Sequence, residues 1–146
     1  MELLFEKEIS VRWADMDPNF HLRHSAYYDF CAQHRLEILD RIGLTLELFQ
    51  KEHIGPVLFR EECIFRREIR FSDRIRLTTR LESTTPDGSR WTIKHQLTKE
   101  EGTLCATIIV DGAWMDTKQR KLARPVPEFI VAGMEKFPKT TDSDVE

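Results

Sequence analysis

The feature that most constrains the fold of this chain is one long helical pattern that stands between strand patterns. From Ser25 to about Ile42, apolar residues recur at spacings of three and four, which is typical of an amphipathic helix, and Gly43 is a suitable stop. Two shorter helices are expected, over about 45–53 and 127–137. The other regular segments have the period of two that a half-buried strand requires.

Strand patterns lie on both sides of the long helix. One alternating segment, 4–13, precedes it, and after Pro56 the chain is strand upon strand. The run Thr103–Met115 is apolar on both faces, which is typical of a strand in the middle of a sheet that is covered on both sides. The remaining expected strands cover 57–71, 75–81 and 91–97, with turns at 86–89 and 100–102.

One long helix followed by antiparallel strands packs best when the sheet wraps around the helix. We therefore predict an α+β fold, an antiparallel β-sheet around a long central α-helix, as a single domain over 1–137 with a flexible polar tail at 138–146. Such a sheet has a free edge, and pairing of edges between two copies removes the hazard of unpaired backbone. The pattern therefore predicts a homo-oligomer, either a dimer or a dimer of dimers.

Charge and composition argue against several classes of protein. The net charge of −3 does not suit a protein that binds duplex nucleic acid, and no apolar run approaches the ~20 residues that membrane insertion requires. The first residues lack the basic and apolar regions of a signal peptide, so we expect a cytoplasmic protein. Cys31, Cys63 and Cys105 are odd in number and far apart, which predicts small buried thiols rather than a zinc site or a disulfide framework.

The segment between the first strand and the long helix carries the residues best suited to chemistry. Asp15 and Asp17 lie in a turn-rich loop, and His21 and His24 follow them just before the helix. A carboxylate in such a loop can act as a nucleophile or as a general base for water, and the free N–H groups of the helix N-terminus can stabilise an oxyanion. A thioester suits this pair, because its carbonyl is electrophilic and its thiolate leaves readily without a metal or a cofactor.

These residues resemble the opening of the 4-hydroxybenzoyl-CoA thioesterase branch of the hotdog superfamily. The resemblance rests on Asp15-Met16-Asp17-Pro18 after a strand and an aromatic residue, on the aromatic helix start with Tyr27, Tyr28 and Phe30, and on the strand pattern over about 5–120. It implies a hotdog fold and an acyl-CoA thioesterase that hydrolyses its thioester to a free acid and CoA.

The resemblance also assigns roles to individual residues. It implies that Asp17 is the catalytic carboxylate and that the backbone N–H of His24 contacts the thioester oxygen. In related bacterial thioesterases encoded near the Tol–Pal system, the corresponding position is a histidine thought to assist, and His24-Ser25-Ala26-Tyr27 is similar to their His-Ala-Ser-Tyr. His21 matches a frequent loop histidine of the family, and Tyr27 is expected to line the acyl pocket or the core.

The loop also departs from the family pattern. Phe20-His21-Leu22-Arg23-His24 stands where Gly-His-Val-Asn-Asn is common, Trp13 replaces a frequent tyrosine, and Ala32 replaces a frequent helix glutamate. These changes concern the choice of substrate and, to a lesser degree, the activity, and leave the expected fold untouched.

Other interpretations of the same residues stay open. Asp17 could serve only to stabilise the Asp-Pro turn, and Asp15 is expected to order the loop. His21 and His24 lack a third soft ligand, so we predict no metal site. The arginines after Pro56 either form a solvated strand face or hold the phosphates of CoA, for which we single out Arg67 and Arg70.

Two alternative functions share this fold. One is a thioesterase that acts on acyl carrier protein, for which the arginines would form a landing surface for an acidic partner. The other is a non-catalytic hotdog protein that binds acyl-CoA, which the departures in the loop favour and the retained Asp17 and His24 oppose.

Overall fold

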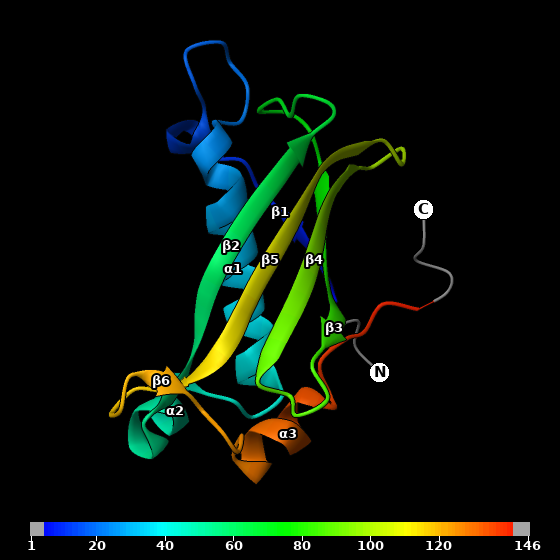
Figure 1. The fold of residues 1–146 in the computed structure, drawn as a ribbon. Coiled ribbons are helices and arrows are strands. Elements are labelled where there is room, and N and C mark those ends of the chain that lie inside the picture. The colour runs from blue at the N-terminus through cyan, green and yellow to red at the C-terminus, as the bar shows by residue number, and fades with distance from the viewer. Residues whose placement is uncertain (1–4, 142–146) are drawn as a thin grey trace.

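The computed structural model describes residues 5–141, and one long helix and one antiparallel sheet dominate it (Figure 1). The sheet is six-stranded with the order β1-β3-β4-β5-β2, and β6 pairs with β5. The helix α1 runs along one face of the sheet (Figure 1). The elements are β1 Glu6–Ile9, the 3-10 turn Trp13–Asp15, α1 His24–Arg41, α2 Leu46–Glu52, β2 Ile54–Phe65, β3 Ile75–Thr84, β4 Arg90–Lys99, β5 Leu104–Asp116, β6 Lys121–Leu122 and α3 Glu128–Met134.

The face of the sheet toward α1 forms the hydrophobic core. Alternation along each strand places one set of side chains inward, and the register aligns these sets, as in the pairs Leu97↔Ala106 and Ile93↔Val110. All four of these side chains are buried, and Ile38 of α1 belongs to the same cluster. The central position of β5, between β4 and β2, confirms the expectation for the run that is apolar on both faces.

The first strand is shorter than the alternation over 4–13 predicts. β1 ends where its partner β3 begins, since the last pair is Ile9↔Ile75. Beyond it the chain has no strand to bond with and turns into the 3-10 segment. The alternation over 4–13 puts Trp13 on the same face as Phe5 and Ile9, but Trp13 lies beyond the end of β1 and is 78% exposed.

The strand expected over 57–71 is also cut short by its partner. β2 pairs with β5 as far as Phe65↔Ala106, and the N–H groups of Arg66 and Arg67 then share the carbonyl of Cys105. The chain leaves the sheet there and forms a loop over 66–74. A strand continued over 57–71 would put Phe71 on the apolar face with Cys63 and Ile69, but Phe71 lies in this loop and is 59% exposed.

The C-terminal part of the described chain returns to the sheet. The carbonyl of Pro138 accepts a hydrogen bond of 2.7 Å from the N–H of Leu81, and the N–H of Thr140 donates one of 3.0 Å to the carbonyl of Leu81. The first residues of the expected tail, 138–140, therefore bond to β3, while 142–146 lie outside the described residues. None of the helices in residues 5–141 is long and apolar enough to cross a membrane.

Candidate functional site

Asp15 anchors the loop between β1 and α1. Its carboxylate is 2% exposed and accepts hydrogen bonds from the backbone N–H of Arg12 at 2.9 Å and from the Arg12 guanidinium at 2.8 and 3.1 Å. Its carbonyl accepts the N–H of Arg23 at 2.7 Å. The hydrogen bonds from Arg12 hold the pKa of Asp15 below its usual range. Asp15 thus joins the two ends of the loop, which agrees with the structural role expected for it.

Asp17 sits at the outer part of the same loop with a different environment. It is half-buried, and its Oδ1 accepts the backbone N–H groups of Asn19 at 2.8 Å and His21 at 3.1 Å. The backbone of Asp17 closes the turn through bonds with His21 and Phe20, and Phe20 has a positive φ of 66°. Within residues 5–141 the Oδ2 atom takes no hydrogen bond, so the backbone fixes the carboxylate while one oxygen stays available.

The helix α1 begins at His24, at the far end of this loop. The side chain of its N-cap residue, Arg23, caps none of the backbone N–H groups of the first turn, and the first turn contains no acidic residue. Instead the Arg23 guanidinium donates to the carbonyl of Ala14 and to the hydroxyl of Ser25. The positive end of the α1 dipole is therefore not offset by a carboxylate of the first turn. His24 itself is exposed and makes no hydrogen bond with Asp17 in the described chain.

A second loop, 66–74, lies against the first. The N–H of Leu22 donates to the carbonyl of Ile69 at 2.7 Å, and His21 forms an isolated antiparallel bridge with Arg70. Glu68 joins the side chains, since it lies 3.1 Å from Nε2 of His21 and 2.7 Å from the Arg70 guanidinium. The Arg70 hydrogen bond, and then the charge of His21, lower the pKa of Glu68.

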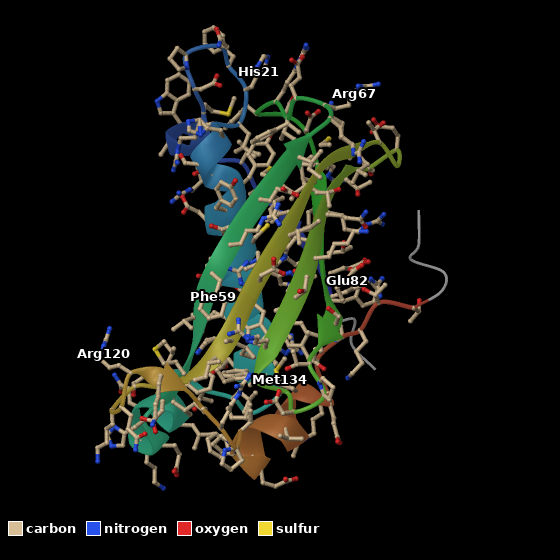
Figure 2. The ribbon with its side chains drawn as sticks, viewed as in Figure 1. His21, Phe59, Arg67, Glu82, Arg120 and Met134 are labelled. Carbon is tan, nitrogen blue, oxygen red and sulfur yellow. The ribbon has the colours of Figure 1, made fainter. Side chains whose placement is uncertain are left out.

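The expected substrate-binding residues thus fall into two sets. His21 and Arg70 meet at Glu68, and Arg67 stands exposed at the same end of the molecule as His21 (Figure 2), where its guanidinium donates to the carbonyl of Arg66 at 2.9 Å. Tyr27 lies inside instead: it is 3% exposed and packs edge-on against Phe65 of β2, with ring centroids 5.0 Å apart. Burial raises the pKa of Tyr27 to about 12, with smaller contributions that include the charge of Asp17.

The middle of α1 holds a buried polar chain that the sequence patterns do not predict. His34 Nδ1 lies 2.6 Å from the hydroxyl of Thr79, and this hydroxyl lies 2.6 Å from Nδ1 of His95. His95 Nε2 is in turn 2.9 Å from the guanidinium of Arg35. The Arg35 side chain is 10% exposed, and its nearest anion is Glu61 of β2, at 3.8 Å. These residues join the helix to three strands.

The direction of this chain follows from its arginine. A guanidinium only donates, so Nε2 of His95 accepts the hydrogen bond from Arg35. Burial lowers the pKa of His95 well below its usual value, which keeps the ring neutral with its proton on Nδ1. Nδ1 then donates to Thr79, whose own proton goes to His34. Alternation did place His95 on the apolar face of β4, and an ionisable residue on such a face is the one local signal that could have revealed this chain.

A cavity of about 240 Å³ opens beside the same part of α1. Ala32, Arg35 and Leu36 line it from the helix, and Trp91 lines it from β4. The indole N–H of Trp91 has no hydrogen-bond partner in the described chain, although the residue is only 5% exposed. Asp17 and His24 are not among the residues that line this cavity.

The three cysteines are free thiols that do not form a reactive cluster. Burial raises the pKa of Cys31 far above that of an ordinary thiol, and it raises the pKa of Cys63 to about 11. Both therefore stay protonated near neutral pH and are poor nucleophiles. Within residues 5–141, no three His, Cys, Asp or Glu side chains gather in a way that could hold a metal ion.

The arrangement of a long helix wrapped by an antiparallel sheet defines a hotdog fold, and solved structures of that fold match over most of the chain. A hypothetical protein from Staphylococcus aureus, solved in complex with CoA, has a TM-score of 0.84 at 20% identity, over 94% of this chain and 87% of that one. A 1,4-dihydroxy-2-naphthoyl-CoA thioesterase from Synechocystis has a TM-score of 0.80 at 17% identity, over 90% and 96%. A hypothetical protein from Thermus thermophilus has a TM-score of 0.79 at 22% identity, over 91% and 98%.

The family follows from the sequence itself. The family model of the Thioesterase-like superfamily matches residues 11–134, so this chain belongs to that superfamily. No curated protein matches it. The resemblance inferred from the aspartate loop and the strand pattern is thereby confirmed, and so is the α+β hotdog fold.

Proposed function

We propose that this protein is an acyl-CoA thioesterase and that Asp17 is its catalytic carboxylate. The observation that carries the proposal is the state of Asp17: two backbone N–H groups hold Oδ1, while Oδ2 takes no hydrogen bond within residues 5–141. Membership of the Thioesterase-like superfamily supports a thioester as the substrate. The CoA bound to the Staphylococcus aureus protein and the CoA thioester named for the Synechocystis enzyme support CoA as the carrier.

The reaction needs a base or nucleophile on one side of the carbonyl and hydrogen-bond donors on the other. Asp17 removes a proton from water as the water oxygen bonds to the carbonyl carbon, or its own oxygen forms that bond and water later cleaves the anhydride. The backbone N–H of His24, at the uncapped start of α1, stabilises the oxyanion, and its imidazole assists. The bond from carbon to sulfur then breaks, and the thiolate of CoA leaves.

The nucleotide end of CoA belongs, in this proposal, to the 66–74 loop. Arg67 is exposed there, and the guanidinium of Arg70 is 65% exposed even though Glu68 pairs with it. Planar guanidinium donors suit phosphate oxygens, and His21 stands beside Arg70. The acyl chain enters between α1 and the sheet, past Tyr27.

We further propose that the protein works in the cytoplasm as a homo-oligomer whose subunits pair along β2. This strand is an edge of the sheet and is 12 residues long, and such an edge invites pairing with another chain. It also exposes large apolar side chains that a second copy would cover, namely Leu58 at 47%, Phe59 at 54% and Phe65 at 53%. Measurement of the molecular mass in solution tests this pairing and distinguishes a dimer from a dimer of dimers.

The experiment is a measurement of thiol release by the full chain from short, long and aromatic acyl-CoAs, and from the same acyl groups on acyl carrier protein. Turnover on CoA thioesters that exceeds turnover on the carrier thioesters is the expected result. Faster turnover on the carrier thioesters would mean that the substrate is an acyl carrier protein thioester rather than an acyl-CoA. Binding of acyl-CoA without release of thiol from either carrier would overturn the hydrolase and leave a binding protein.

A further inference from the structure

The cavity beside α1 is lined mostly by apolar side chains, and its polar groups are the guanidinium of Arg35 and the indoles of Trp91 and Trp114. The side chain of Arg35 is 10% exposed, and one of its five N–H groups donates to His95, its one hydrogen bond within residues 5–141. Trp91 contributes a second donor without a partner in the described chain, and its ring also lines a further cavity of about 200 Å³ beside α3. The unpaired indole N–H is costly to bury, and the Arg35 guanidinium has N–H groups besides the one that His95 accepts, so this cavity suits a ligand with an acceptor oxygen.

Arg35 is held in place rather than free to swing into solvent. The chain through His95, Thr79 and His34 fixes one of its nitrogens from behind, in contacts of 2.6 to 2.9 Å. Glu61, at 3.8 Å, lies beyond hydrogen-bond distance, so it offsets the charge without taking up the donors. A guanidinium fixed in this way is organised to bind an oxygen of a ligand before the ligand arrives.

Arg35 lies on the same face of α1 as His24 of the candidate active site. Residues 24, 28, 32, 35 and 39 follow each other at spacings of three and four, so one face of the helix runs from His24 to the cavity. β2 lies beside this part of the helix, since Phe65 packs on Tyr27 and Glu61 approaches Arg35. His24 and Arg35 are eleven residues apart, which is about 16 Å at 1.5 Å per helical residue.

We propose that Arg35 is a specificity-determining residue that binds an oxygen at the far end of the acyl chain, a carboxylate or a hydroxyl. This inference rests on the proposed function, because it takes the thioester to lie at Asp17 and His24. With hydrogen-bond distances at both ends of the 16 Å span and about 1.2 Å per chain bond, the preferred acyl group has roughly eight to twelve carbons. The substrate class is therefore a medium-chain acyl thioester with an oxygenated terminus.

The test compares three CoA thioesters with ten carbons each, which end in a methyl group, a hydroxyl or a carboxylate. The full chain is expected to show a kcat/KM at least tenfold higher for the two oxygenated substrates, with the carboxylate first because charge-assisted hydrogen bonds are stronger. Arg35→Met is expected to reduce these ratios to about one, and Arg35→Lys to restore part of the carboxylate preference alone. Arg41→Met, an exposed arginine on the same helix outside the cavity, is expected to leave the ratios as they are.

Ratios within one variant do not depend on how much of it is folded, so loss of stability in Arg35→Met does not obscure the result. Equal kcat/KM for the three substrates, or a preference that survives Arg35→Met, would overturn the role of Arg35 while hydrolysis stands. If no thioester is hydrolysed, the dissociation constants of the three thioesters, measured by calorimetry, test the Arg35 site instead. A preference in binding that Arg35→Met removes would support the site although the thioesterase is wrong, and equal binding would refute it.

Discussion

Polar groups are held in different ways at the start and in the middle of α1. At the start of α1, polar groups meet across two to four residues of sequence: Asp17 is held by the N–H groups of Asn19 and His21, and Asp15 by Arg12. In the middle of α1, His34, Thr79 and His95 meet across separations of 45 and 16 residues. The loop is built by its own backbone and leaves a carboxylate oxygen available, whereas the middle depends on the assembled sheet.

This difference explains which parts of the molecule could be predicted from the sequence. The succession of strands along the chain, the long helix and the turn-rich segment that contains Asp17 are local features. Alternation, helical spacing and turn residues were therefore enough to predict them. The ends of β1 and β2 were misplaced, because each is set by where a distant partner strand begins or ends. The contact of Arg35 with His95 joins residues 60 apart, and no local pattern contains it.

Removal of the Thr79 hydroxyl, at the centre of the buried chain, is expected to have the largest effect on stability. Thr79→Val keeps the shape but leaves Nδ1 of both His34 and His95 facing a methyl group, and we expect it to lower the free energy of unfolding by about 2–4 kcal/mol. Chemical denaturation measures this loss. Thr79→Ser keeps the hydroxyl and is expected to lose only about 1 kcal/mol with the methyl group. Equal losses in the two variants would mean that packing, and not the hydrogen bonds, holds this region.

A smaller effect sharpens the same contrast through pH. Burial lowers the pKa of His95 from its ordinary 6.5, so below pH 6.5 the unfolded chain binds a proton that the folded chain does not. The stabilisation from neutral His95 is fully present well above pH 6.5 and is lost as the pH falls, by about 1.3 kcal/mol between pH 7 and 5.5. Asp15 does not contribute to this pH dependence. Its pKa is lowered in the folded chain, so its protonation affects stability only near and below its ordinary pKa of 3.8.

Denaturation at several pH values checks this prediction, with His95→Gln as the reference. The difference in stability between the full chain and His95→Gln should shrink as the pH falls from 7 to 5.5. A difference that stays constant over that range would show that His95 does not titrate between the folded and unfolded states.

A comparison of Asp17→Asn with Asp15→Asn, in thiol release and in unfolding, tests the catalytic role of Asp17 directly. Asp17 acts on the substrate and Asp15 on the loop, so Asp17→Asn should lower kcat at least 100-fold and leave stability unchanged. Asp15→Asn should lose about 1–3 kcal/mol of stability, because it weakens the buried contacts with Arg12. Its folded fraction should keep most of its turnover. An Asp17→Asn protein that releases thiol at the rate of the unaltered chain would contradict the account.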